Sequence, residues 1–259
     1  MHQPPEVSEL LDQLLAGVTQ ALGDNLLGVY LRGSLALGDF DPETSDIDTL
    51  VVTQRPVSDA QFDALAALHD RIAAGNNPYS DHFEVSYIDR ASVRRFAPGE
   101  RRHPMMSSHN EPPFGRHEHG ENWALERWTV REHGVALLGP DPKTLIDPIS
   151  PEELLRAARA RLPGWARWAA HPDNPEWLPR RSHQAYVVET MCRALHTLAL
   201  GEVSTKPQAV AWALETLAEP WRSLVRRSQA WRADDADDAS TVPEVLRFVR
   251  WAASQAEAG

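Results

Sequence analysis

Cysteine and lysine are both scarce in this chain of 259 residues. The single cysteine, Cys192, excludes an internal disulfide and any zinc site built from several cysteines. Only two of the 26 basic residues are lysines, Lys143 and Lys206, and the others are arginines. This scarcity makes each lysine stand out, and it favours a specific role for Lys206.

Positive charge is also in deficit. The chain has 26 basic and 37 acidic residues, a formal net charge of −11 and an isoelectric point near 5.4. Proteins that bind nucleic acids usually carry a basic surface, so we do not expect DNA or RNA to be the main partner. The excess of acid instead favours a cationic small molecule as ligand.

Long hydrophobic runs are absent as well. No apolar stretch approaches the roughly 18 residues that a membrane-spanning helix needs, and the first residues lack the basic and apolar regions of a secretory signal. We therefore expect a cytoplasmic protein that engages no membrane and acts as a monomer. A composition of 42% apolar and 24% charged residues is typical of a folded protein, and the length suits two modest domains.

The first half of the chain predicts an α/β (α+β) domain. Apolar residues at helical spacing predict a helix over 8–22, with Ser8 as its cap, and another over 58–74. Apolar or alternating segments predict three strands, at 26–31, 47–53 and 82–88. Interleaved in this order, the segments are expected to form a mixed β-sheet with flanking helices.

Residues 94–122 break this pattern. The segment is rich in Pro, Gly, Arg and His without periodicity, which predicts a long loop, and such loops are usually functional or mobile. His117 and His119 stand two apart within it, but structural zinc sites generally use cysteine, so a mobile loop is favoured and a metal site is not. A helix over 123–132 and a short strand over 135–140 are expected to follow.

The chain after Pro151 has the pattern of amphipathic helices. Five segments show it, at 151–170, 183–201, 206–218, 221–233 and 242–256. Such a series predicts an all-α helical bundle. We therefore expect an α/β domain of residues 1–150 followed by a helical domain of residues 151–259.

The polar residues that carry chemistry lie around the first two predicted strands. Asp46 and Asp48 stand two apart at the start of a strand, so both side chains project from one face. Two carboxylates fixed in this way can bind Mg²⁺, which prefers oxygen ligands and usually adds phosphate oxygens. Gly33 and Ser34, which follow the preceding strand, offer backbone N–H groups and a hydroxyl to such phosphates. Each feature is common alone, but their combination is a specific signal.

With these motifs the sequence resembles the DNA-polymerase-β-like nucleotidyltransferases, whose hallmark is a Gly-Ser pair, a gap and a D-x-D pair that begins a strand. It is most similar to the aminoglycoside adenylyltransferases of the streptomycin and spectinomycin type. The shared segments are YLRGS, SDIDTLVV, a later strand with a glutamate, REHGVALLGP and an all-helical C-terminal half. The resemblance covers nearly the whole chain and is weakest in 94–122.

The resemblance implies metal-dependent nucleotidyl transfer from ATP as co-substrate. Asp46 and Asp48 would ligate two Mg²⁺ ions. Glu84, in FEVSYI, would be the third acidic residue at the metal site and the general base for the acceptor hydroxyl. The helical domain would complete the nucleotide and acceptor sites, so the resemblance also implies an active site in a cleft between the domains.

Phosphate contacts are implied from both domains. In the first domain they come from Gly33, Ser34 and Ser45. In the helical domain, Arg193 in TMCRAL and Lys206 in VSTKPQAVAWA match phosphate-contacting residues. Trp231 in SQAWRA falls where the family has a tyrosine near the phosphates, and an indole lacks the tyrosine hydroxyl.

The acceptor site is implied by fewer residues. Trp168 and Asp173, in RWAAHPD, have the spacing of a tryptophan and an aspartate that contact the antibiotic in the family. Beyond them the chain carries extra residues, and His183 stands near the place of another acidic contact. The resemblance therefore implies a small cationic acceptor that carries hydroxyl groups.

The leading hypothesis is Mg²⁺-dependent transfer of AMP from ATP to a hydroxyl of an aminoglycoside or aminocyclitol antibiotic, with release of pyrophosphate. The alternatives are transfer to another small hydroxylated metabolite or to a protein side chain, and a nucleotide-binding regulator without catalysis. Nucleotidyltransferases that modify proteins are typically short, so the helical half argues against that alternative. An intact Glu84 argues against a regulator, because binding alone does not need a third carboxylate.

Overall fold

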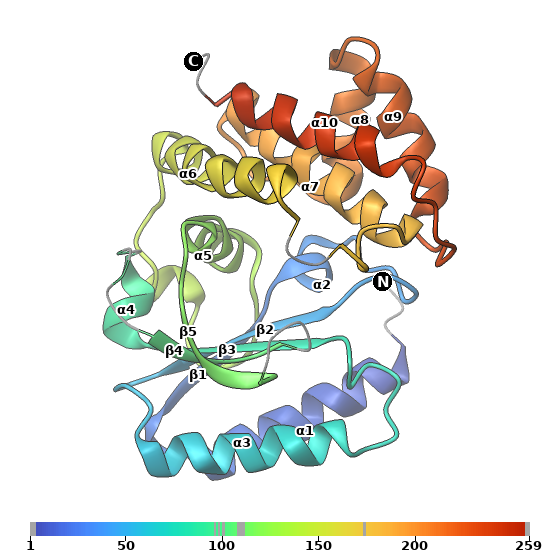
Figure 1. The fold of residues 1–259 in the computed structure, drawn as a ribbon. Coiled ribbons are helices and arrows are strands. Elements are labelled where there is room, and N and C mark those ends of the chain that lie inside the picture. The colour runs from blue at the N-terminus through green and yellow to red at the C-terminus, as the bar shows by residue number, and fades with distance from the viewer. Residues whose placement is uncertain are drawn as a thin grey trace. The chain divides into compact units, whose positions relative to one another are not determined.

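The computed structural model describes residues 4–95, 97, 99, 102–107, 112–172 and 175–256 (Figure 1). The chain divides into two compact units, Met1–Ile149 and Ser150–Gly259. The first unit contains a six-stranded sheet with helices on both faces, and the second is helical. The predicted fold class is therefore confirmed. Among the described helices, none is long and apolar enough to cross a membrane.

The sheet has the strand order β5-β4-β3-β2-β1-β6. Its strands are β1 (Leu26–Leu31), β2 (Ile47–Thr53), β3 (Phe83–Asp89), β4 (Arg102–Met106), β5 (Phe114–Glu118) and β6 (Val135–Leu138). β2 and β3 pair in parallel, and the other neighbours in this order are antiparallel. Most residues of the three central strands are buried, as expected for strands that are covered on both faces.

Helices α1 (Pro5–Leu22) and α3 (Asp59–Ala73) lie side by side on one face of the sheet (Figure 1). Their apolar residues form one core with the sheet. The prediction that Ser8 caps α1 was wrong, because the helix begins three residues earlier, after Pro4. Proline suits the first helical position, where its fixed φ is already helical and its missing N–H has no partner to lose.

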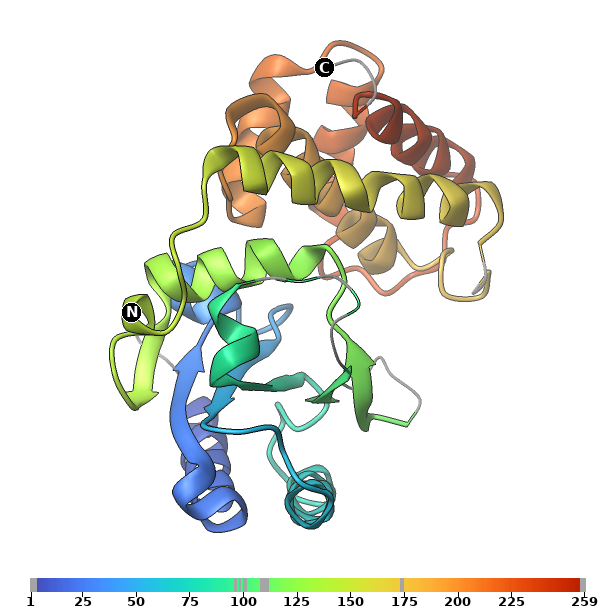
Figure 2. The ribbon, with the colours of Figure 1, turned by 90° about the vertical axis from the view of Figure 1, so that its left-hand side faces the viewer.

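The opposite face is covered by α5 (Asn122–His133), as Figure 2 shows. Trp123 and Val130 of α5 pack on Tyr30 and Leu50 of the sheet. The remaining elements of this unit are short: η1 (Gly23–Asn25), α2 (Gly33–Leu37), α4 (Arg90–Arg94) and η2 (Pro142–Thr144).

The prediction of a loop without secondary structure over 94–122 was wrong for much of the segment. β4 and β5 form an antiparallel hairpin, in which His103 pairs with His117 and Met106 with Phe114. β5 is an edge strand whose residues are half-buried or exposed. Such a strand needs no alternation of apolar and polar residues, so the sequence pattern did not indicate it.

The second unit consists of α6 (Pro151–Ala170), α7 (Arg181–Leu200), α8 (Lys206–Thr216), α9 (Trp221–Ser228), η3 (Gln229–Trp231) and α10 (Val242–Ser254). Capping boxes start two of them: Ser150 exchanges hydrogen bonds with Glu153 at α6, and Thr205 with Gln208 at α8. Both caps fix where the helix begins.

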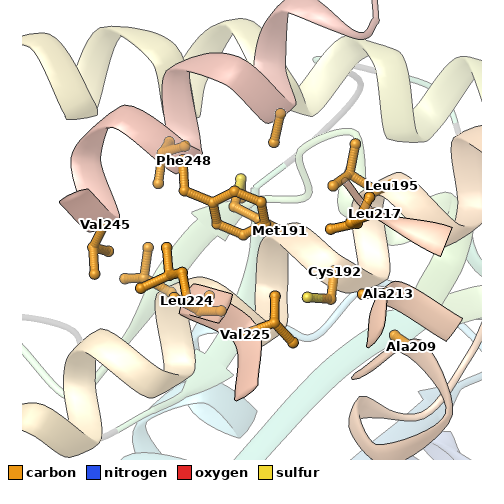
Figure 3. Packing of buried hydrophobic residues seen from close by; sticks show 14 of the residues in the cluster. Met191, Cys192, Leu195, Ala209, Ala213, Leu217, Leu224, Val225, Val245 and Phe248 are labelled. Carbon is orange, nitrogen blue, oxygen red and sulfur yellow. The ribbon is translucent and has the colours of Figure 1, made fainter. Parts of the chain in front are cut away.

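The core of this unit is built around α7 (Figure 3). Met191 and Cys192 of α7 point toward Leu224 and Val225 of α9 and toward Phe248 of α10. Cys192 is fully buried, and burial raises the pKa of its thiol to about 12. It therefore behaves as a small apolar side chain.

Candidate active site

Two parallel strands hold the acidic residues that the sequence singled out. β2 and β3 pair in register, with Ile47 opposite Phe83 and Asp48 opposite Glu84. Asp46 precedes Asp48 by two residues and faces the same side. The side chains of Asp48 and Glu84 are 19% and 21% exposed, and that of Asp46 is 37% exposed. The structure thus brings all three carboxylates to one end of the parallel pair.

A buried guanidinium joins these carboxylates. Arg32 directly follows β1, and its backbone N–H donates to the carbonyl oxygen of Asp48 at 3.0 Å. Its Nη2 lies 3.2 Å from Oδ1 of Asp48 and 3.5 Å from Oε2 of Glu84. Its Nη1 lies 2.7 Å from Oε2 of Glu126. Arg32 is only 5% exposed, so one buried cation bridges three carboxylates.

Helix α5 supports this cation. Glu126 accepts a hydrogen bond at 2.9 Å from Nδ2 of Asn122, one turn earlier on the helix. The guanidinium carbon of Arg32 lies 5.8 Å from the centre of the Trp123 ring. The shortest ion pair of Arg32 is thus made with a carboxylate that α5 itself holds in place.

Negative charge exceeds positive charge in this group. Burial raises the pKa of Asp48 to about 7. Arg32 lowers this pKa, and the negative charges of Glu84, Glu126 and Asp46 raise it further. Burial also lowers the pKa of Arg32, but the surrounding carboxylates outweigh it and raise that pKa above its usual value. Three carboxylates around one buried arginine, with Asp46 close to Asp48, suit the binding of a further cation.

The Gly-Ser pair begins the short helix α2 rather than a simple turn. Gly33 has a φ of 60°, a left-handed conformation that glycine adopts without strain. A Cβ atom at this position would lie 2.1 Å from Oδ2 of Asp48, so only glycine leaves room for that carboxylate. Oγ of Ser34 is buried and has no hydrogen-bond partner among the described residues. A buried hydroxyl of this kind suits a phosphate oxygen.

Ser45 and His82 lie beside Asp46. Oγ of Ser45 accepts the backbone N–H of Asp41 at 3.0 Å and closes the turn before β2. Nδ1 of His82 lies 3.3 Å from Oδ1 of Asp46. Ser45 and His82 line a cavity of 150 Å³ together with Pro42, Glu43, Pro78 and Tyr79.

Glu84 is held at both carboxylate oxygens. Oγ of Ser107, which directly follows β4, donates to Oε1 at 2.8 Å, while Oε2 faces Arg32. A carboxylate fixed in this way is oriented before any substrate arrives, which is what a general base requires.

In the helical unit, Arg193 and Lys206 lie around a buried glutamate. Glu189 is 3% exposed, and its Oε1 lies 3.1 Å from Nε of Arg232. Burial raises the pKa of Glu189, against the opposing charges of Arg232, Lys206 and Arg193. The structure therefore gathers the two predicted phosphate-binding cations, with Arg232 as a third.

Each of these cations has a defined position. Nε of Arg193 donates to the carbonyl oxygen of Ser204 at 3.1 Å, and Nζ of Lys206 lies 5.1 Å from the centre of the Tyr186 ring. Trp231 is only 7% exposed and packs in the core of the unit. Its structural environment is that of a core residue.

Trp168 lies at an aromatic cavity of 370 Å³ in the helical unit. The other residues that line this cavity are Arg161, Gly164, Trp165 and Trp177. The rings of Trp165 and Trp168 meet edge to face at 5.4 Å, and His183 stacks on Trp177 at 4.2 Å. Asp173, the other predicted acceptor contact, lies outside the described residues.

Comparison with known protein families matches both halves of the chain. A nucleotidyltransferase domain model matches residues 11–99, and the model of the aminoglycoside adenylyltransferase C-terminal domain matches residues 144–255. The second half of the chain thus matches the aminoglycoside adenylyltransferase family, of which the whole chain is a distant homologue. This confirms the predicted family and makes the protein a nucleotidyltransferase.

Relatives align over most of the length of this chain. An aminoglycoside (3'')(9) adenylyltransferase of Shigella flexneri is 25% identical over 95% of this chain and 93% of its own. A spectinomycin 9-adenylyltransferase of Campylobacter jejuni is 24% identical over 97% of this chain and 96% of its own. The spectinomycin adenyltransferase AAD(9) of Enterococcus faecialis, solved with ATP and spectinomycin, has a similar fold, with a TM-score of 0.77 at 16% identity. That alignment covers 95% of this chain and 99% of the other.

The candidate site has oxygen donors suited to Mg²⁺. Across the described ranges, no three His, Cys, Asp or Glu side chains are already arranged as a metal site. Mg²⁺ rarely needs three protein ligands, since it is usually bound by one or two carboxylates together with substrate phosphates. Asp46 and Asp48 supply two such carboxylates, and the excess of negative charge around them favours a cation. The residues present therefore fit Mg²⁺.

The sequence did not indicate three residues that the adenylyltransferase site contains: Arg32, Ser107 and Glu126. Arg32 stands next to the Gly-Ser pair, and this position was the only available signal. Ser107 and Glu126 come from segments far along the chain. The pairing of β4 with β3 brings Ser107 to Glu84, and the packing of α5 on the sheet brings Glu126 to Arg32.

Proposed function

We propose that this protein transfers AMP from ATP to a hydroxyl group of an aminocyclitol or aminoglycoside antibiotic and releases pyrophosphate. The observation that carries the proposal is the pairing of Glu84 with Asp48 on parallel strands, beside the hydroxyl of Ser34, which has no partner in the described part of the chain. This arrangement supports a proton acceptor next to a site for metal and phosphate. Relatives named for the same reaction on spectinomycin or aminoglycosides support the choice of acceptor class.

Glu84 acts as the general base. It accepts the proton of the acceptor hydroxyl, whose oxygen then attacks the α-phosphorus of ATP. The new P–O bond forms as the bond from the α-phosphorus to the β-phosphate oxygen breaks, and pyrophosphate leaves with that electron pair. Ser107 and Arg32 hold the carboxylate of Glu84 in one orientation during this step.

Each unit offers polar groups that are suited to phosphate. Asp46 and Asp48 are the residues that would hold Mg²⁺, which supplies charge neutralisation on the triphosphate when bound. Gly33, Ser34 and Ser45 donate hydrogen bonds to phosphate oxygens from the first unit. In the helical unit, Arg193 and Lys206 are the cations that we assign to charge-assisted hydrogen bonds with phosphate.

The acceptor is recognised by aromatic rings and by charge. The indoles of Trp165, Trp168 and Trp177 offer faces on which the rings of an aminocyclitol can stack, and protonated amines are attracted to such faces. Asp173 is the carboxylate that we assign to pairing with an ammonium group of the acceptor. The net charge of −11 favours the approach of a cation.

Pyrophosphate release tests this proposal. Purified protein with Mg²⁺ and ATP is assayed against streptomycin, spectinomycin and unrelated aminoglycosides. We expect stoichiometric pyrophosphate and an adenylylated product with at least one aminocyclitol. Absence of pyrophosphate with every compound, while ATP still binds, would exclude the antibiotic as acceptor and direct the search to other hydroxylated metabolites.

A further inference from the structure

Arg32 lies against one carboxylate of the proposed metal site and against the proposed base. Its Nη2 lies 3.2 Å from Asp48 and 3.5 Å from Glu84, the two carboxylates that face each other across β2 and β3. Its side chain is 6% exposed, so the guanidinium and its partners are shielded from water. At these distances and in this environment, a charge on Arg32 acts strongly on any ion bound by Asp48.

Glu126 sets where Arg32 rests. Its Oε2 makes the shortest ion pair of Arg32, at 2.7 Å, and its Oε1 accepts the side-chain amide of Asn122 at 2.9 Å. Trp123 of the same helix lies against the guanidinium. Glu126 therefore anchors the guanidinium on α5. The contacts of Arg32 with Asp48 and Glu84 are longer and more easily lost.

We propose that Arg32 is a built-in counter-cation of the acidic site, anchored by Glu126, and that it makes tight binding of a divalent cation depend on the nucleotide. A divalent ion alone meets the positive charge of Arg32 close to Asp48. A divalent ion with a triphosphate adds negative charge that compensates this repulsion, and the guanidinium keeps its pair with Glu126. Arg32 is thus a positioning residue, and the inference rests on the proposed metal site.

Binding of Mn²⁺ measures this dependence directly. Free Mn²⁺ is followed by electron paramagnetic resonance during titration of the full-length protein, with and without ATP and without acceptor. We expect wild-type protein to bind Mn²⁺ at least about tenfold more tightly with ATP than without it, since a nearby charge shifts such equilibria by one or more powers of ten. Protein that binds no Mn²⁺ even with ATP would overturn both the proposed metal site and this inference.

Substitution of Arg32 separates the two claims. Arg32→Gln removes the charge and is expected to bind Mn²⁺ without ATP about tenfold more tightly than wild type, which reduces the effect of ATP. Arg32→Lys keeps the charge and is the matched control, expected to resemble wild type. The exposed Arg55 provides a second control, because Arg55→Gln changes the net charge equally and leaves the site intact. Weaker or unchanged Mn²⁺ binding by Arg32→Gln would overturn the inference and leave the proposed function standing.

Glu126→Gln tests whether Glu126 anchors Arg32. It also tests the inference if Arg32→Gln does not fold. Without the charge of Glu126, the guanidinium of Arg32 is held by Asp48 and Glu84 alone. We expect nucleotide-free Mn²⁺ binding to weaken several-fold, with a larger relative effect of ATP than in wild type. Unchanged or tighter binding without ATP would contradict the anchoring role of Glu126.

Discussion

At the scale of single residues, Gly33 gives the most direct structural prediction. Gly33 and Gly23 have positive φ values of 60° and 52°, so alanine at either position costs about 1–3 kcal/mol in backbone strain. A Cβ atom at Gly33 also meets Asp48, whereas one at Gly23 meets nothing within 4 Å. We expect Gly33→Ala to lower kcat about 100-fold, because displaced reacting groups lose about that much. Gly23→Ala should keep the wild-type kcat.

These two variants are compared by pyrophosphate release and by urea denaturation. Similar losses of stability with very different kcat values would separate the effect on Asp48 from backbone strain. A Gly33→Ala protein with wild-type kcat would contradict the placement of Asp48 at the reacting centre.

Ser107 is expected to act through Glu84. Loss of its hydrogen bond to Oε1 frees one side of the base, so Ser107→Ala should lower kcat about tenfold with little change in KM for ATP. Ser8→Ala, an exposed serine on α1, is the matched control and should change neither kcat nor stability. Steady-state kinetics check both, and a loss confined to KM would instead place Ser107 in ATP binding.

Much of the acidic site could be predicted from the sequence because its chemistry follows local spacing. Asp46 and Asp48 share a face as a consequence of the two-residue repeat of a strand, and Gly33 precedes them in a known order. Arg32 and Glu126 carry no such signal, because an arginine and a glutamate 94 residues apart in the chain become partners only through folding. Their pairing depends on α5 covering the sheet face beside β1.

At the scale of elements, the packing of α3 on the sheet predicts how stability depends on pH. Nε2 of His69 on α3 lies 2.8 Å from the hydroxyl of Tyr87 on β3, and burial lowers the pKa of His69 to about 3. Between pH 6.5 and 3 the unfolded chain binds a proton at His69 that the folded chain does not bind. The contribution of His69 to the free energy of unfolding should therefore fall by about 1.4 kcal/mol for each pH unit lost in that range.

Urea denaturation between pH 7 and 4.5 measures this slope. His69→Gln should make the slope shallower by about that amount, whatever its effect on stability at pH 7. His171→Gln replaces an exposed histidine and should leave the slope as in wild type. An identical slope in His69→Gln and wild type would show that His69 is not buried in the neutral form.

Elements with strong periodicity could be predicted, and elements on the sheet edge could not. Apolar residues at regular spacing in the sequence become the buried faces of helices α1, α3 and α7 and of the central strands. β4 and β5 carry Arg, His and Pro, because an edge hairpin is stabilised by backbone pairing with β3 more than by apolar burial. The same lack of pattern concealed Ser107, which the hairpin delivers to Glu84.

At the scale of the whole molecule, the two lysines provide a comparison for the contribution of the helical unit. Lys206→Gln should raise KM for ATP about tenfold, because a charge-assisted hydrogen bond to phosphate is lost. Lys143→Gln is the matched control, since Lys143 is 49% exposed and pairs with Glu132 at 3.2 Å. Its KM for ATP should be unchanged. Equal KM values for both variants would remove Lys206 from the nucleotide site.

Catalysis by this protein is tested most directly by measuring both Mg²⁺-ATP binding and pyrophosphate release in the variant Glu84→Gln. Glu118→Gln, an exposed glutamate on β5, serves as control. Loss of a general base typically costs a factor of about 10² to 10⁴ in rate. With the acceptor present, Glu84→Gln should therefore release pyrophosphate at least about 100-fold more slowly than wild type. It should bind Mg²⁺-ATP like wild type. A Glu84→Gln protein that keeps the wild-type rate would contradict Glu84 as the base and the mechanism built on it.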